Sequence, residues 1–190
     1  MKKKILLSFI LFSLFSLSIF AEENTSGTHT VAAVMMQEGG AIWMQNQNGI
    51  MMWNASLPQG TKLEMYVSDQ TDFQGNSQPL TVTAWTNSNG TSTKNTFTKV
   101  RYQNSDFYVI SNRLSQADQP GKISVACAVY TKLDFLSVKN KSLPKETFVC
   151  IGNTFSVAEN IDFTEITYFD SLNFSTITAY VLAEKVEAIK

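Results

Sequence analysis

Histidine, cysteine and arginine are scarce in this chain of 190 residues, which has one histidine, two cysteines and two arginines. His29 is therefore the only base available for Ser–His or Cys–His catalysis, and it lies in a polar N-terminal stretch. One histidine and two cysteines do not make a zinc-ligand set. The sequence also lacks a glycine-rich phosphate loop. It predicts a protein that is not an enzyme and that binds no metal or cofactor.

Charge of either sign is sparse as well, with 15 basic and 16 acidic residues. Only Arg101 and Arg113 are arginines, and no basic stripe runs along the chain, which argues against a nucleic-acid partner. The carboxylates are scattered, and we interpret them as solvated surface residues. The most prominent ones are Asp69, Asp72, Asp106, Asp162, Glu165 and Asp170.

One long apolar run is present, at the N-terminus. Three lysines at 2–4 precede an apolar stretch at 5–20, which is followed by Ala21 and two glutamates. The stretch has 16 residues, fewer than the ~20 that a membrane-spanning helix needs. This layout predicts a cleaved signal peptide at 1–21 rather than a retained anchor. The mature chain would keep 12 basic and 16 acidic residues, a net charge of −4. We expect an exported protein in the periplasm, cell envelope or extracellular space, without a membrane span.

The two cysteines, Cys127 and Cys150, lie in successive strand-like segments. In an exported protein they can form one disulfide. Equally, both can be buried thiols that pack as small apolar side chains. The sequence leaves these two alternatives open.

The rest of the chain consists of short strand-like runs separated by turn residues. Many short strands at close spacing predict an all-β fold of small barrels or a sandwich. A short helix is expected only in the final residues 183–190. The expected strands are 30–36, 41–44, 62–67, 80–85, 96–102, 107–111, 123–131, 146–151, 155–158, 163–168 and 176–182.

Several motifs occur twice in the same order. SLPQGT at 56–61 corresponds to SLPKET at 142–147, and FTKVRY at 97–102 corresponds to FTEITY at 163–168. Tyr-Val pairs follow at 108–109 and 180–181. Upstream, AVMMQEGGAIWM loosely matches ACAVYTKLDFLSV. The repetition predicts two tandem domains of similar fold.

The spacing of the motifs differs between the copies. The SLP motifs are offset by 86 residues and the FT motifs by 66, so the first copy carries 20 extra residues within 68–95. The second copy has a longer loop at 169–179. The predicted domains are therefore 30–114, with an insertion at 68–95, and 122–187.

The repeated motifs resemble those of the bacterial SH3-like (SH3b) domain family. In the first copy they are Leu57-Pro58-Gln59-Gly60-Thr61, the strand 97–102 and the strand 107–114. The second copy departs by having Glu146 where the first has Gly60. The resemblance implies two small, strongly bent β-barrels. It also implies a link to cell-wall binding, which is common among exported members of that family.

Aromatic side chains are the candidates for a binding surface, because rigid rings provide contact area at little entropic cost. For Tyr102, Tyr108, Tyr168 and Tyr180 we favour a place in the core. A separate apolar cluster, Trp43, Met51, Met52 and Trp53, surrounds the NQNG turn, and the sequence leaves open whether it is core or a contact patch. The full candidate set is Tyr66, Trp85, Tyr102, Tyr108, Tyr130, Phe135, Tyr168 and Tyr180.

Two functions are compatible with this sequence. In the first, the protein is a non-catalytic binding module for a peptide, for peptidoglycan or for another envelope component. In the second, it is a structural or assembly subunit of an envelope complex and has no small-ligand site. Tandem weak sites, which gain affinity through avidity, favour the first. Function is expected where the copies differ, at 68–95 and 169–179.

Overall fold

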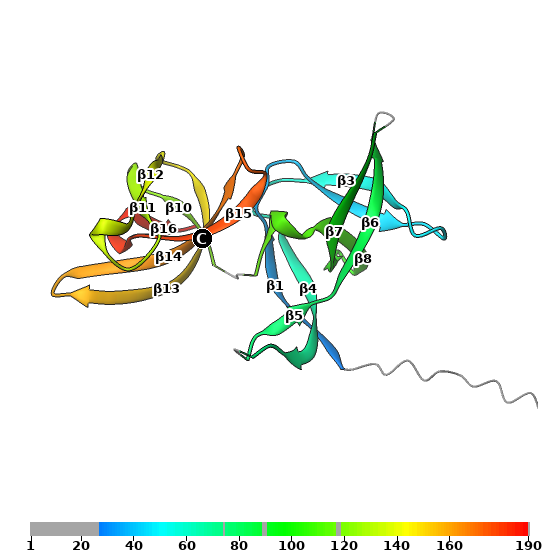
Figure 1. Ribbon diagram of the computed structural model, residues 1–190, viewed down its shortest axis with the longest axis horizontal. Helices are drawn as coiled ribbons and strands as arrows, with labels where there is room; N and C mark the ends of the chain where they lie inside the picture. Colours follow the sequence, from blue (N-terminus) through cyan, green and yellow to red (C-terminus); the bar gives the residue numbers. More distant parts are fainter. Residues whose placement is uncertain (1–26, 74, 89–90, 117–118, 190) are drawn as a thin grey trace, which may run out of the picture.

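The computed structural model describes residues 27–73, 75–88, 91–116 and 119–189. Within these ranges the chain consists of strands and three single turns of 3-10 helix (Figure 1). The predicted all-β class is therefore confirmed. The strands form two sheets, one from residues 28–115 and one from residues 120–188, called here the first and second halves. In the described part of the chain, no helix has the length and apolarity needed to cross a membrane.

The first half contains nine strands and the 3-10 turn η1 (Ser111–Arg113). Their order in the sheet is β6-β3-β2-β8-β7-β4-β1-β9, and β5 pairs with β4. Because β6 also pairs with β7, the strands β6, β3, β2, β8 and β7 form a closed ring. The strand bounds are β1 (Thr28–Met35), β2 (Gly40–Gln45), β3 (Met51–Leu57), β4 (Lys62–Thr71), β5 (Ser77–Pro79), β6 (Thr81–Ser88), β7 (Thr91–Tyr102), β8 (Ser105–Ile110) and β9 (Leu114–Ser115).

The second half contains seven strands and the 3-10 turns η2 (Phe135–Ser137) and η3 (Ala183–Lys185). Their order in the sheet is β12-β11-β15-β14-β13-β10-β16. The strand bounds are β10 (Pro120–Ile123), β11 (Cys127–Tyr130), β12 (Val138–Leu143), β13 (Phe148–Ala158), β14 (Ile161–Asp170), β15 (Ser175–Leu182) and β16 (Val186–Ala188).

The two halves have the same strand order. The path β3-β2-β8-β7-β4-β1-β9 of the first corresponds, strand for strand, to β12-β11-β15-β14-β13-β10-β16 of the second. The extra strands β5 and β6 both come from the segment 68–95, where the sequence places an insertion. The strand order thus repeats as the sequence motifs do.

The repeated SLP motifs form the same turn twice. The Thr61 N–H donates to the Pro58 carbonyl at 3.3 Å, and the Thr147 N–H donates to the Pro144 carbonyl at 3.3 Å. The two threonine hydroxyls donate to the same carbonyls at 2.8 and 2.7 Å. The motif is therefore a turn signature, in which a threonine side chain and backbone share one acceptor.

The residue before each threonine shows that the two turns differ in sequence but not in backbone conformation. The Gly60 N–H donates to the Met35 carbonyl at 2.8 Å, and the Glu146 N–H donates to the Ile123 carbonyl at the same distance. Gly60 has a φ of 84° and Glu146 a φ of 67°. Glutamate thus takes a left-handed conformation that glycine adopts without a steric cost.

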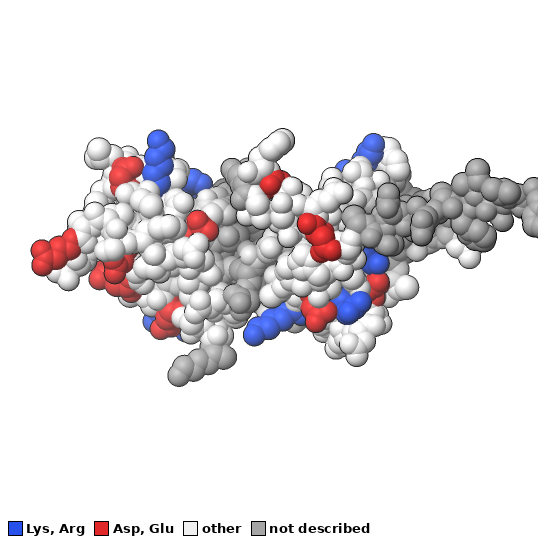
Figure 2. Space-filling model, turned by 90° about the horizontal axis from the view of Figure 1, so that it is seen from below, with Lys and Arg blue, Asp and Glu red and all other residues white. Residues whose placement is uncertain are grey.

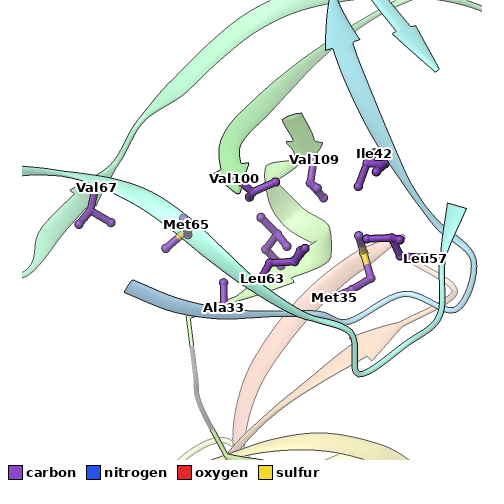
Figure 3. Packing of buried hydrophobic residues seen from close by; sticks show 10 residues of the cluster. Ala33, Met35, Ile42, Leu57, Leu63, Met65, Val67, Val100 and Val109 are labelled. Atoms are coloured by element: carbon purple, nitrogen blue, oxygen red, sulfur yellow. The ribbon is translucent and has the colours of Figure 1, made fainter. Parts of the chain in front are cut away.

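Each half has its own apolar core. In the first half, Val100 and Val109 are fully buried among residues of β1, β2, β3 and β4 (Figure 3). In the second half, Ile166 and Tyr168 are buried in the corresponding cluster. Alternation along a strand explains why these positions face inward. Tyr102, expected in the core, is only half-buried and packs against the edge of the first cluster.

The halves contact each other through a third buried cluster. Val34 of β1 and Met36, which follows it, pack with Cys150 of β13, and Phe148 and Phe169 pack against them. The Cys150 sulfur lies 3.3 Å from the Met36 sulfur. Burial raises the pKa of the Cys150 thiol to about 11.

Both cysteines are free thiols in the structure, so of the two alternatives left open by the sequence, the thiol is the one observed. Cys150 is buried and Cys127 is half-buried at the start of β11. Each therefore packs as a small apolar side chain.

Several local expectations were wrong. The strands β3 and β12 were not predicted, and the helix expected at 183–190 is one 3-10 turn followed by β16. The expected strands 146–151 and 155–158 form one strand, β13, which is interrupted by a bulge. The strand pairings also align the two upstream segments, AVMMQEGGAIWM and ACAVYTKLDFLSV. Trp43 pairs with Tyr108 and Tyr130 pairs with Tyr180, so Trp43 and Tyr130 are counterparts.

Candidate functional site

The eight aromatic candidates do not form one surface. Trp85 and Phe135 are the exposed ones, at 52% and 49%. The other six are buried or half-buried, including Tyr168, which is 1% exposed. In the first half, Tyr66 is buried and Tyr102 and Tyr108 are half-buried; in the second half, Tyr130 and Tyr168 are buried and Tyr180 is half-buried.

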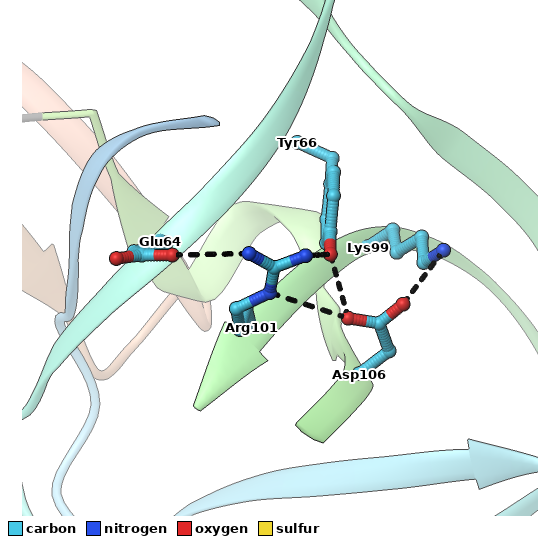
Figure 4. Close-up of polar contacts among 5 residues, drawn as sticks. All are labelled: Glu64, Tyr66, Lys99, Arg101 and Asp106. Carbon is cyan, nitrogen blue, oxygen red and sulfur yellow. Dashed lines mark hydrogen bonds and ion pairs between the residues drawn. The ribbon is translucent and has the colours of Figure 1, made fainter. Parts of the chain in front are cut away.

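Tyr66 belongs to a polar network between β4, β7 and β8 (Figure 4). Its hydroxyl donates to Asp106 Oδ1 at 2.7 Å and accepts a hydrogen bond from Arg101. Lys99 Nζ lies 2.9 Å from Asp106 Oδ2 and 4.7 Å from the centre of the Tyr66 ring. Arg101 also reaches Glu64, with 3.9 Å between Nη1 and Oε2.

The network shifts the pKa values of its own members. Burial, followed by the hydrogen bond to Asp106, raises the pKa of Tyr66. The hydrogen bond from Tyr66 lowers the pKa of Asp106, and Lys99 lowers it further. Because the donors and acceptors satisfy one another, we interpret this group as a cross-strand brace rather than as a ligand site.

A cluster of three aromatic rings lies at the start of β12 in the second half. The Phe135 ring centre is 5.9 Å from that of Tyr130 and 5.3 Å from that of Phe163. Tyr130 and Phe163 are themselves 5.1 Å apart and nearly perpendicular. Phe163 is fully buried, whereas Phe135 keeps about half of its surface exposed above it. Perpendicular rings at such distances attract through their quadrupoles.

The turn η2 holds Phe135 in this position. The Asp134 carboxylate accepts a hydrogen bond from the Leu136 N–H at 2.7 Å. The Ser137 hydroxyl donates to the carbonyls of Lys132 and Asp134, and it accepts from the Lys132 N–H. The local sequence Asp-x-x-Ser thus closes the loop on both sides of the ring.

Phe135 forms one wall of a cavity of about 310 Å³. The cavity is bounded by the start of β14 and by the chain leaving β15. Its other lining residues are Asn160, Ile161, Asp162, Leu182, Ala183 and Glu184. The lining thus combines apolar side chains with three polar ones, Asn160, Asp162 and Glu184, a combination that is typical of ligand sites in proteins.

Among the described residues, the lining of this cavity carries carboxylates and no basic side chain. Between Phe148 and Leu182 the chain has four acidic residues and no lysine, arginine or histidine. Figure 2 shows acidic side chains at the end of the molecule where Figure 1 places the β13–β14 hairpin. Two lining residues, Asp162 and Glu184, are carboxylates, and Glu184 is paired with Lys185 at 2.7 Å. The cavity therefore suits a cationic rather than an anionic group.

In the first half, the region that corresponds to this cavity is filled by side chains of the protein itself. Trp43 packs edge-on against Phe97, with the ring centres 5.9 Å apart. Met51 and Ala84 complete this buried cluster, and Ala84 comes from the inserted strand β6. The insertion thus covers Phe97, the counterpart of Phe163, with a strand rather than with a half-exposed ring.

The outer face of the same strands carries exposed apolar side chains. Met51 pairs with Thr86 across β3 and β6, and both are buried. Their neighbours Met52 and Trp85 therefore lie on the outer face, where they are 53% and 52% exposed. Met44 pairs with Met52 and is also exposed. We call Met44, Met52 and Trp85 the outer apolar patch.

Two further cavities are present. One, of about 300 Å³, lies beside Tyr102 and is lined by both acidic and basic side chains. The other, of about 350 Å³, lies between the halves and is lined by Gly60, Lys62 and Phe148 among others. Neither contains one of the two exposed aromatic candidates.

No metal or catalytic arrangement is seen in the described part of the chain. No three histidine, cysteine, aspartate or glutamate side chains there lie close enough to hold a metal ion. His29 lies in β1 rather than in a loose segment, and its Nδ1 is 2.6 Å from the Asp69 carboxylate. This pair is on the surface, half exposed on both sides.

Of the residues that line the cavity, sequence reasoning named only Phe135 as a binding residue; it missed the apolar lining residues Ile161 and Leu182. Asp162 was interpreted as a solvated carboxylate. The available signal was the long stretch without a basic residue around it. Comparison with protein-family models, with curated proteins and with solved structures gives no match for this chain.

Proposed function

We propose that this is an exported, non-catalytic binding protein, made of two tandem SH3-like barrels that follow a cleaved signal peptide at 1–21. Its ligand is a peptide or another component of the cell wall or envelope. The repeated strand order and the repeated SLP turn support the tandem arrangement. The proposed barrels correspond to residues 30–114 and 122–187.

One observation carries the binding function: the half-exposed Phe135 ring at the mouth of the acidic cavity in the second half. A half-exposed phenylalanine on two buried rings offers apolar area that is already rigid, so little entropy is lost when a ligand covers it. The cavity is large enough for one side chain or a small sugar substituent rather than for a whole polymer.

A second candidate function is that of an assembly subunit in an envelope complex. The outer apolar patch of the first half favours it, because Met44, Met52 and Trp85 are all exposed on one face. Exposed apolar residues gathered on one face often mark contacts between proteins. In this alternative Trp85 contributes to the contact with the partner protein, and the cavity beside Phe135 does not take part in it.

Co-sedimentation of the mature chain with purified peptidoglycan, and its capture on immobilised envelope peptides, test the proposal. We expect Phe135→Ala to reduce retention at least about tenfold, since a central aromatic contact is worth about 2 kcal/mol. The matched control is Leu172→Ala, which removes another exposed apolar side chain, in the β14–β15 turn.

The outcomes separate the two functions. Loss with Phe135→Ala but not with Trp85→Ala supports the binding module. Loss with Trp85→Ala alone, together with capture of an envelope protein rather than peptidoglycan, supports the assembly subunit. Retention of neither material by the unaltered chain would refute the binding proposal.

A further inference from the structure

The cavity beside Phe135 is walled by three separate elements. Phe135 comes from η2, and Ile161 and Asp162 come from the start of β14. Leu182 comes from the end of β15, where it pairs with Phe163 of β14. Because β14 and β15 are paired without interruption from residue 163 to residue 170, two of the three walls keep a fixed spacing.

Apolar side chains make up the larger part of the lining. The half-exposed Phe135 ring packs on the buried rings of Tyr130 and Phe163, which fix its position. Ile161 and Leu182 are half-buried and lie on the other walls of the same cavity. An aliphatic chain placed between these side chains would remove apolar surface from water on both partners.

The polar part of the lining has one carboxylate that is not yet paired. Among the described residues, the Asp162 carboxylate has no ion pair and no hydrogen bond. The other lining carboxylate, that of Glu184, lies 2.7 Å from Lys185 Nζ, so its charge is already offset. A cation that enters the cavity can therefore pair with Asp162 without displacing an existing partner.

The first half has an uncharged residue at the position of this carboxylate. Thr96 precedes Phe97 in β7, as Asp162 precedes Phe163 in β14, and the two strands pair with their neighbours in the same register there. The space above Phe97 is also occupied, since Met51 packs against that ring. A site for a cation is therefore expected in the second half alone.

We propose that the cavity binds an alkylammonium group, namely the side chain of a lysine or of another diamino acid in a peptide. The methylene chain lies against Phe135, Ile161 and Leu182, and the ammonium group donates a hydrogen bond to the Asp162 carboxylate. This inference deepens the proposed function and rests on it, since it names the part of the ligand that the same site takes.

The lining favours this group over other components of an envelope. A sugar has hydroxyl groups on every side, and a largely apolar lining would leave most of them without hydrogen bonds. An acidic side chain would meet Asp162 as a like charge. An aliphatic chain with one cationic end matches both parts of the lining, and an aromatic ring such as Phe135 attracts a cation placed over its face.

A set of small probes tests the ligand class, and their binding to the mature chain is measured by residue-resolved NMR titration. The probes are glucosamine and the methylamides of Nα-acetyl-lysine, Nα-acetyl-norleucine and Nα,Nε-diacetyl-lysine. Norleucine keeps the aliphatic chain without the ammonium group. We expect shifts at Phe135, 160–162 and 182–184, and the lysine probe should bind at least about fivefold more tightly than the others.

Matched variants test which residues make the contacts. Asp162→Asn removes the charge and keeps the shape, so it should weaken the lysine probe by about two- to fivefold and leave the norleucine probe unchanged. The control is Glu159→Gln, which removes an exposed carboxylate of the same hairpin that is not one of the lining residues. It should leave both probes unchanged, whereas Phe135→Ala should weaken both.

Equal binding of the lysine and norleucine probes, or an equal loss with Glu159→Gln and Asp162→Asn, overturns the assignment of an ammonium ligand. Tighter binding of glucosamine overturns it in favour of a sugar, and the absence of binding by every probe, or shifts confined to the first half, overturns it as well. The proposed function still stands after any of these results if peptidoglycan or an envelope peptide is retained. Retention of neither by the unaltered chain refutes the proposed function itself.

Discussion

The two halves of the molecule have the same order of seven strands, yet they treat one edge differently. In the first half, β6 lies between β7 and β3 and completes a ring over Phe97. In the second half, residues 154–158 of β13 take the place of β6 beside β14 but do not pair with β12 in the described part of the chain, and the half-exposed Phe135 ring packs against the fully buried Phe163. A strand order can thus be repeated while the ring of strands is closed in one copy and stays open beside β12 in the other.

A smaller difference lies in the SLP turn. The two turns have the same hydrogen bonds and the same left-handed residue, but that residue is glycine in the first half and glutamate in the second. Glu146 contributes an ion pair with Lys122 at 2.9 Å, which Gly60 cannot form. Topology is thus preserved while the local energetics change.

The largest effect is expected from a charge placed in one core at a time. Val100→Asp and Ile166→Asp occupy equivalent, fully buried positions in β7 and β14. An unpaired buried carboxylate costs more than about 4 kcal/mol, comparable to the whole stability of a small domain. Residue-resolved hydrogen exchange should show that each variant unfolds its own half.

The matched control is Thr96→Ala, an exposed position of β7. It should change the free energy of unfolding by no more than about 0.5 kcal/mol. If Val100→Asp left exchange in the first half at its original rate, the assignment of that core would be wrong. Simultaneous unfolding of both halves would show instead that the Met36–Cys150 contact couples them.

A moderate effect that differs between the two halves is expected at the turn. Gly60→Ala places a side chain at a φ of 84°, and its Cβ would lie 3.1 Å from the Phe148 ring. We expect a loss of about 1–2 kcal/mol in the free energy of unfolding, measured by urea denaturation. Glu146→Gly relieves the same conformation and removes only the solvent-exposed ion pair with Lys122, which contributes little, so it should be neutral or stabilising. Destabilisation by both variants to the same extent would contradict this explanation.

The smallest effect is expected from acid. The pKa of Asp106 is lowered from its ordinary value of 3.8 by the hydrogen bond from Tyr66 and by Lys99. Its contribution to stability is therefore present above that value and is lost as the pH falls toward the folded-state pKa. The pKa of Asp170 is lowered mainly by Lys141, with the same sign in the second half.

Unfolding free energies measured between about pH 2 and pH 6 test this comparison. Asp106→Asn should reduce the fall of the unfolding free energy at low pH in the first half only. Asp170→Asn should have the same effect in the second half only. The effect of Asp170 should be the larger one, because its side chain is 6% exposed whereas that of Asp106 is 43% exposed. An equal effect of either variant on both halves would point to a general charge effect instead.

Much of the architecture was predictable, because alternation and turn residues are local signals. The FT and Tyr-Val motifs became β7, β8, β14 and β15, and the described residues of the 68–95 insertion became the end of β4, β5, β6 and the start of β7. β3 and β12 were missed because their residues show no clean alternation of apolar and polar side chains. The terminal residues formed β16 rather than a helix because they pair with β10.

The candidate site was less predictable. Phe135 was named and is exposed, but Tyr66, Tyr130 and Tyr168 were named beside it although all three are buried. The reason is physical: a tyrosine in a strand can face either side, and only the pairing register decides which. Leu182 and Ile161 carry no signal of their own, since they line the cavity only after β14 and β15 pair.

The amino-acid sequence by itself determined the all-β class, the repeated order of motifs and the site of the insertion, because strand alternation, turn chemistry and internal repetition are written along the chain. Only the tertiary structure decided which aromatic rings are exposed, that Cys127 and Cys150 remain free thiols, and that β6 closes one edge while β12 leaves the other open. Those features depend on which strands meet across long sequence separations, and strand register is set by packing rather than by any local residue pattern.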